Sequence, residues 1–170
     1  MLVTLWSIAT HKSKPTANTL EATMMLLNYA DNSTDATICY HASDILLYAH
    51  SDASYLSEPK ARIREGAYLL LSDKQSDPSK PLSTPTPLSG LIFFLSKILR
   101  KIMSAAGEAE IVAYFLTATE AVPIRTTLHE LGQPKPATHI QVDGTTCNGF
   151  ANKTIKQKLT KLIDMRFYCL

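Results

Sequence analysis

The sequence predicts an α/β fold in which a long helix covers a sheet. The order of the segments is the first reason, because short stretches rich in β-forming residues precede the longest helical stretch, and a short strand and a further helical stretch follow it. Periodicity is the second, since residues 104–131 place apolar side chains on one helical face. Composition is the third: 45% hydrophobic and 19% charged residues are typical of a globular protein with its own core.

The N-terminal half predicts one helix followed by strands. Residues 20–30 carry apolar side chains at helical spacing, and Thr19 is a possible N-cap. Stretches rich in β-forming residues then predict three strands, over residues 36–41, 45–52 and 67–73.

The second half alternates loop, strand and helix. Residues 73–90 hold four of the nine prolines and are expected to form an exposed loop. Pro123 is expected to kink or break the long helix, which Gly132 closes. The expected elements are, in order, a buried strand over 91–98, the helix over 104–131, a short strand over 139–142 that ends at Asp143, and a helix over 148–170.

Composition excludes several classes of protein. The chain has 170 residues, which suits one domain, and its formal charge of +2 does not by itself indicate a polyanionic partner. The three cysteines form no CxxC pair and the five histidines no HxxxH pair, so neither a disulfide framework nor a zinc site is expected. The apolar start lacks the features of a signal peptide, and residues 88–99 are too short to cross a membrane, so no membrane partner is expected.

Three carboxylates stand at places where functional groups collect in α/β proteins. Asp52 ends one predicted strand, Asp143 ends another, and Glu110 lies near the start of the long helix. If they converge, their mutual repulsion requires cations, and Mg²⁺ is the natural partner because it is hard and prefers oxygen. An alternative stays open at this point, since Asp commonly terminates strands and acidic residues suit the first turn of a helix.

Three blocks of the chain, in order, resemble the ribonuclease H region of copia-type retrotransposon polyproteins. They are HSDASYLSEPKARIREGAYLLLSD, SAAGEAEIVAYFLTATEAVPIRTTLHELG and IQVDGTTCNGFANKTIKQKLTKLIDMRFY. The second block is similar to the SSxEAE helix of that family, and the third to its DNxSA strand end and the basic segment that follows. The resemblance covers roughly residues 16–168 and implies a ribonuclease H-like mixed sheet with a long helix packed on it.

The resemblance also implies a site and a reaction. Asp52, Glu110 and Asp143 match the family's first three catalytic carboxylates, which hold two Mg²⁺ or Mn²⁺ ions and hydrolyse RNA in an RNA–DNA hybrid. Glu108 lies about 200° around the helix from Glu110 and is the poorer match. Candidate phosphate contacts are the lysines that follow, which equally suit a solvated helix face: Lys153, Lys156, Lys158 and Lys161.

Departures from the family pattern limit the expected activity. Gly144 stands where Asn is usual, Ala105 where Ser is usual, and the fourth carboxylate with its strand and helix is expected beyond Leu170. The implied protein is a truncated fragment with weak or no activity, or a dead remnant that at most binds nucleic acid or protein. A more distant alternative is an unrelated α/β domain whose acids are turn residues.

Two parts and a setting follow from the resemblance. Residues 1–35 resemble the linker helix at the end of reverse transcriptase, and residues 36–170 the incomplete ribonuclease H-like domain. The reverse transcriptase portion of the polyprotein is therefore an expected partner. The expected location is intracellular, in the cytoplasm or nucleus.

Overall fold

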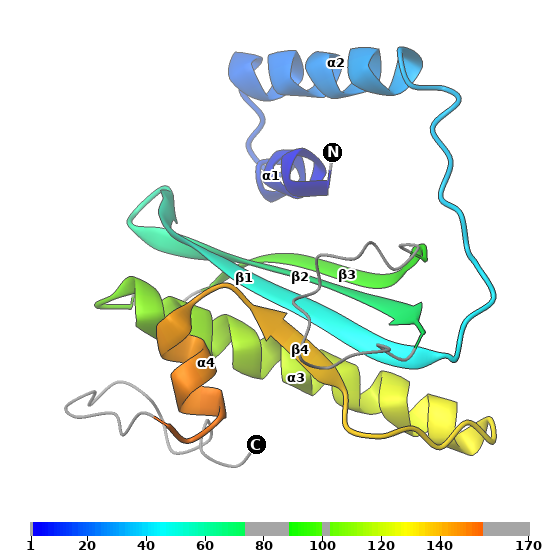
Figure 1. Cartoon of the computed structure of the whole chain (residues 1–170). Coiled ribbons are helices and arrows are strands. Elements are labelled where there is room, and N and C mark those ends of the chain that lie inside the picture. Colours follow the sequence, from blue (N-terminus) through cyan, green and yellow to red (C-terminus); the bar gives the residue numbers. More distant parts are fainter. Residues whose placement is uncertain (1, 74–88, 100–102, 155–170) are drawn as a thin grey trace. The chain divides into compact units, whose positions relative to one another are not determined.

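The computed structural model describes residues 2–73, 89–99 and 103–154 of the chain, in two compact units (Figure 1). The first unit comprises Met1–Ile38 and the second Cys39–Leu170. Within the described residues, no helix is both long and apolar enough to span a bilayer.

The first unit contains two helices that contact each other, α1 (Leu2–Thr10) and α2 (Ala17–Asp31). The N-cap of α2 is Thr16, not the predicted Thr19. The two threonines form a reciprocal capping box, in which the Thr19 amide donates to Thr16 Oγ1 (3.3 Å) and the Thr16 amide donates to Thr19 Oγ1 (3.2 Å). Helix α1 was not predicted, because nine residues are too few for periodicity to mark a helix clearly.

The second unit is a mixed sheet with a long helix along one face (Figure 1). Its described strands lie in the order β3-β2-β1-β4, and β4 is parallel to β1 whereas the other neighbours are antiparallel. This confirms the predicted α/β layer fold with a mixed sheet. The elements are β1 (Leu46–Glu58), β2 (Arg62–Ser72), β3 (Leu91–Leu99), α3 (Ala106–Glu130), β4 (His139–Val142) and α4 (Thr145–Ala151).

The strand predicted over residues 36–41 is wrong. That segment is irregular and bonds to the residues just before β3: Gly90 donates its amide to the Cys39 carbonyl at 2.8 Å. The strand predicted over 45–52 is too short, because β1 continues through the polar residues as far as Glu58. Cross-strand pairing with β2 compensates for this polar sequence, so Asp52 lies within β1 and not at its end.

The predicted break at Pro123 is also wrong, because α3 is one continuous helix through this residue. Proline removes one helical hydrogen bond, but the apolar face of α3 continues on both sides of it. Ala121 before the proline, and Ile124 and Leu128 after it, pack in one cluster with buried residues of β1 and β2. Tertiary packing therefore holds the helix together across the proline.

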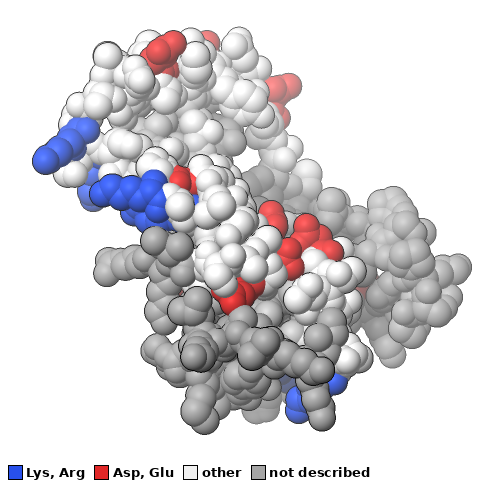
Figure 2. All heavy atoms as spheres, turned by 90° about the vertical axis from the view of Figure 1, so that its left-hand side faces the viewer, with Lys and Arg blue, Asp and Glu red and all other residues white. Residues whose placement is uncertain are grey.

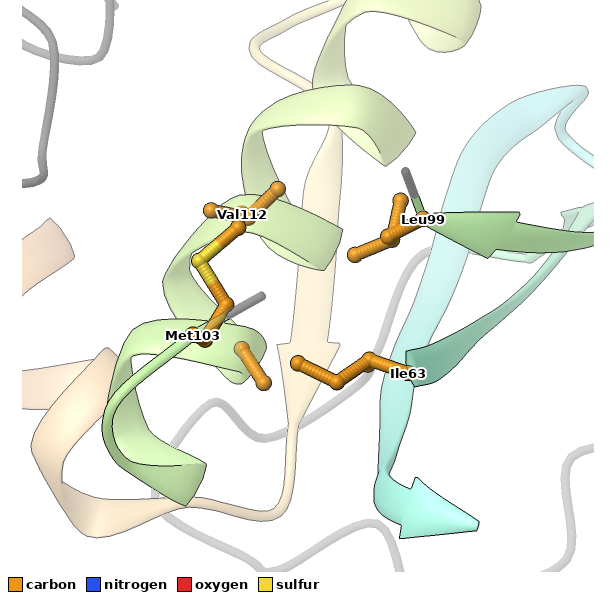
Figure 3. Close-up of a cluster of buried hydrophobic side chains, with 5 residues drawn as sticks. Ile63, Leu99, Met103 and Val112 are labelled. Carbon is orange, nitrogen blue, oxygen red and sulfur yellow. The ribbon is translucent and has the colours of Figure 1, made fainter. Parts of the chain in front are cut away.

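A second cluster of buried side chains joins the start of α3 to the far side of the sheet (Figure 3). Ile63 of β2 and Leu99 of β3 pack against Val112 of α3 and Met103, which precedes the helix. Each fully buried aliphatic side chain of this kind contributes about 1.5–3 kcal/mol to stability. The cluster fixes the N-terminal turns of α3, including Glu110, against the sheet.

One carboxylate lies inside this layer. Glu65 of β2 is fully buried, and strand alternation places it on the same face as Ile63 and Leu69, facing α3. Neither of its carboxylate oxygens has a hydrogen-bond partner within the described residues. Burial raises the pKa of Glu65 to about 7, a shift that Lys97 opposes and Glu120 reinforces.

Two predictions reach beyond the described residues. The predicted loop over 73–90 falls largely in 74–88, and the helix predicted over 148–170 falls largely in 155–170, both outside the described residues. Within the described part, α4 begins earlier than predicted, at Thr145, and ends at Ala151. The strands over 91–98 and 139–142 are confirmed.

Candidate acidic site

Asp52 and Asp143 lie side by side at one end of the parallel strand pair β1 and β4. Their preceding residues, Ser51 and Val142, are the last partners in the register of that pair. Parallel strands run in the same direction, so the next residue of each strand comes to the same end of the sheet. Both aspartates are exposed there.

Glu110 completes this group from the second turn of α3. Burial raises its pKa first, and the negative charges of Asp143 and then Asp52 raise it further. All three predicted carboxylates are thus close enough for their charges to interact, and we call Asp52, Glu110 and Asp143 the acidic edge. Figure 2 views the molecule from the side where α3 begins and shows acidic side chains gathered at the surface.

Two glycines bring the start of α3 close to the start of α4. A Cβ atom at Gly107 of α3 would lie 3.2 Å from Cγ2 of Thr146 in α4. At the other contact, a Cβ at Gly144 would overlap the carboxylate of Glu110. Sequence reasoning identified Gly144 only as a turn residue and as a departure from the family pattern. The sequence DG carries no signal for a contact with a side chain 34 positions earlier.

Cys147 forms the inner wall beside the acidic edge. It is fully buried and packs with Ile111, while Tyr114, Val142 and Phe150 surround the pair. Burial raises the pKa of the Cys147 thiol to about 12, and the charges of Glu110 and Asp143 contribute. The thiol is therefore protonated at neutral pH. Only the three-dimensional packing reveals this neighbour, because the isolated cysteine matches no motif.

The acidic edge has the donor chemistry of a Mg²⁺ site, although its side chains are not arranged around a common point. Carboxylate oxygens are the ligands that Mg²⁺ prefers, and the repulsion among these three is relieved by a cation. Asp52 Oδ1 instead accepts a hydrogen bond from the Ala53 amide at 2.7 Å. Within the described ranges, no group of three His, Cys, Asp or Glu side chains is positioned to hold a metal. The residues fit the ion chemically, and metal binding would require side-chain rotation.

Glu108 is held apart from this group, as the helical spacing predicted. It is buried, and its Oε2 accepts hydrogen bonds from the amide (3.0 Å) and the hydroxyl (2.7 Å) of Ser104. Glu108 therefore caps the start of α3. Its role is structural.

The four predicted lysines are only partly described. Lys153 is exposed just after α4, with a positive φ of 57°. Lys156, Lys158 and Lys161 lie outside the described residues. Their predicted contact with phosphates stays a prediction.

A cavity of about 330 Å³ lies along β4, separate from the acidic edge. Five consecutive residues, 138–142, line it, so it follows the strand backbone and not one face of the strand. The rest of its lining comes from the two neighbouring helices: Tyr114, Asn148, Ala151 and Asn152. The three carboxylates do not line it.

Comparison with known proteins points to mobile genetic elements. The chain is 24% identical over 148 residues to the retrovirus-related Pol polyprotein from transposon TNT 1-94 of Nicotiana tabacum. This similarity supports an origin in a retrotransposon polyprotein. The aligned region covers 87% of the chain but only 10% of the polyprotein, so the chain spans about a tenth of that relative. No protein-family profile matches the chain, and no solved structure matches it.

Proposed function

We propose that this chain is a ribonuclease H-like part of a retrotransposon polyprotein, which hydrolyses the RNA strand of RNA–DNA hybrids with divalent metal ions. One observation carries the proposal: three acids from β1, α3 and the end of β4 interact electrostatically at one exposed edge. The similarity to a retrotransposon polyprotein supports the same setting. The reverse transcriptase portion of such a polyprotein is the proposed partner.

Each carboxylate has a distinct part in the proposed site. Asp52 and Asp143 are exposed and would present their oxygens to metal and substrate, whereas Glu110 is partly buried and would anchor the ions from the helix side. Two Mg²⁺ or Mn²⁺ ions bound there would activate a water molecule and stabilise the leaving oxygen. Because Asp52 is turned toward its own backbone, binding must also displace the hydrogen bond from Ala53, which favours slow turnover.

A cleavage assay on the full chain tests the proposal. We expect slow cleavage of the labelled RNA strand of a hybrid with Mg²⁺ or Mn²⁺, and a loss of at least about 100-fold in Asp52→Asn, since this change removes a metal ligand. Asp31→Asn is the matched control, because this exposed aspartate ends α2 in the other compact unit. Cleavage that persists in Asp52→Asn, or absence of cleavage with both metals, would contradict the proposed activity.

A further inference from the structure

The geometry points to Gly144 as the positioning residue for Glu110: a position without a side chain, which lets the Glu110 carboxylate lie against the backbone beside Asp143. We infer that any side chain at position 144 displaces this carboxylate and weakens metal binding at the acidic edge. The inference rests on the proposed function and deepens it, because it names a residue that holds no metal but sets where one ligand lies.

The first step is that Gly144 is not required by the backbone. Its φ of −76° and ψ of 122° are open to any residue. Gly132, by contrast, has a φ of 77° and so needs the conformational freedom of glycine. Space, and not backbone conformation, is therefore what glycine supplies at position 144.

The second step is what fills that space. The place of a Cβ atom is taken by the carboxylate group of Glu110, and the nearest atoms are Oε2, Cδ and Oε1 of this one side chain. These atoms are the far end of a flexible side chain. A residue with a Cβ can therefore be accommodated if Glu110 rotates away, without movement of the backbone.

The third step is that the Glu110 carboxylate has other neighbours on this side. Its charge, together with that of Asp143, acts on the buried thiol of Cys147 one turn into α4. The carboxylate is thus held among Asp143, Gly144 and Cys147, at the junction of β4 and α4. Rotation away from Gly144 removes it from Asp143, the neighbour with which it would share a metal ion.

Titration of Mn²⁺ into the full chain, followed by electron paramagnetic resonance of the free ion, tests the inference. We expect Gly144→Ser to weaken Mn²⁺ binding by about 10- to 100-fold, as when a residue that orients a ligand is lost. Serine is chosen because Gly144 is the N-cap of α4, where serine is at least as good as glycine and alanine is poor. A weaker helix cap therefore cannot account for the loss.

Gly66→Ala is the matched control. Gly66 lies opposite Asp52 in the β1–β2 register, and a Cβ there meets nothing within 4 Å. We expect its Mn²⁺ affinity to equal that of the unsubstituted chain. Equal binding by Gly144→Ser would overturn the inference, and so would failure of that variant to fold, because only the Glu110 side chain should have to move.

The inference and the proposed function fail in different ways. No Mn²⁺ binding by the unsubstituted chain would overturn the metal site itself. A crystal structure of Gly144→Ser, solved without metal, then still decides the geometric part. A Glu110 carboxylate displaced from residue 144 supports the positioning role, and a carboxylate that keeps its place overturns it.

Discussion

The acidic edge and the buried Glu65 are both groups of carboxylates beside α3, but they are treated in opposite ways. At the edge, three acids from different elements lie close together with solvent on one side. In the core, Glu65 is fully buried, and within the described residues its oxygens have no hydrogen-bond donor. In both places, burial is the largest cause of the raised pKa of the glutamate.

The difference lies in which cation is able to neutralise the charge. A metal ion has access to the exposed edge, so repulsion among the acids there becomes binding energy for an ion. At Glu65 the surroundings are two strands and a helix, so a proton is the cation at hand. The first group is suited to function, whereas the second makes stability depend on pH.

Glu65→Gln should give the largest change in stability. Because its folded pKa of about 7 lies above the ordinary value of 4.5, the free energy of unfolding is highest below about pH 4.5 and falls as the pH rises through about 7. That loss amounts to about 3 kcal/mol above pH 8. Glutamine has no charge to bury, so we expect the variant to keep this stability, as measured by urea unfolding at pH 5 and pH 8.

Glu130→Gln is the control for that measurement, since Glu130 is exposed at the end of the same helix. It should follow the pH dependence of the unsubstituted chain. If Glu65→Gln loses stability between pH 5 and pH 8 as steeply as the unsubstituted chain does, the buried carboxylate is not the cause.

At the acidic edge, Mg²⁺ should stabilise the chain by an intermediate amount. A ligand at ten times its dissociation constant adds about 1.4 kcal/mol to the free energy of unfolding. Asp143→Asn should abolish this gain and, without metal, should be no less stable than the unsubstituted chain, because it relieves repulsion on Glu110. Thermal melting with and without Mg²⁺, at constant ionic strength, measures both effects. An equal gain in the variant, or none in the unsubstituted chain at millimolar Mg²⁺, would count against the edge as a metal site.

Thr117→Val should give the smallest change, again in the core. Thr117 is fully buried on α3, and its hydroxyl has no partner within the described part of the chain. Valine has nearly the same shape without the hydroxyl, so we expect a gain of about 1 kcal/mol in urea unfolding. Thr119→Val on the exposed side of α3 is the comparison and should change stability by less than about 0.5 kcal/mol. Destabilisation by Thr117→Val would mean that the hydroxyl is satisfied.

The sequence predicted the elements with clear periodicity and missed those that depend on pairing. The strand His139–Val142 alternates and was predicted residue for residue. Strand β2 was predicted to start at residue 67, because Arg64 and Glu65 before it are charged, yet both are buried within the strand. Arg64 donates to Glu58 at 2.6 Å across the hairpin, a partner that no local pattern reveals.

The candidate site shows the same division. The three acids were found through an ordered resemblance, and the parallel pairing of β1 with β4 brings two of them together. The positions of Asp52 within a strand and of Glu110 against Gly144 depend on contacts between segments far apart in the chain. Such contacts leave no local pattern in a single sequence.

The protonated thiol of Cys147 gives the acidic edge a direction. Behind the acids lies a closely packed, uncharged wall of Cys147 and Ile111, and in front of them lies water. The acids therefore sit on a dielectric boundary, where the low-dielectric side screens poorly and the field of the carboxylates extends mainly outward. Such a boundary concentrates mobile cations in front of the edge before any of them is coordinated, and it repels nucleic acid that arrives without them.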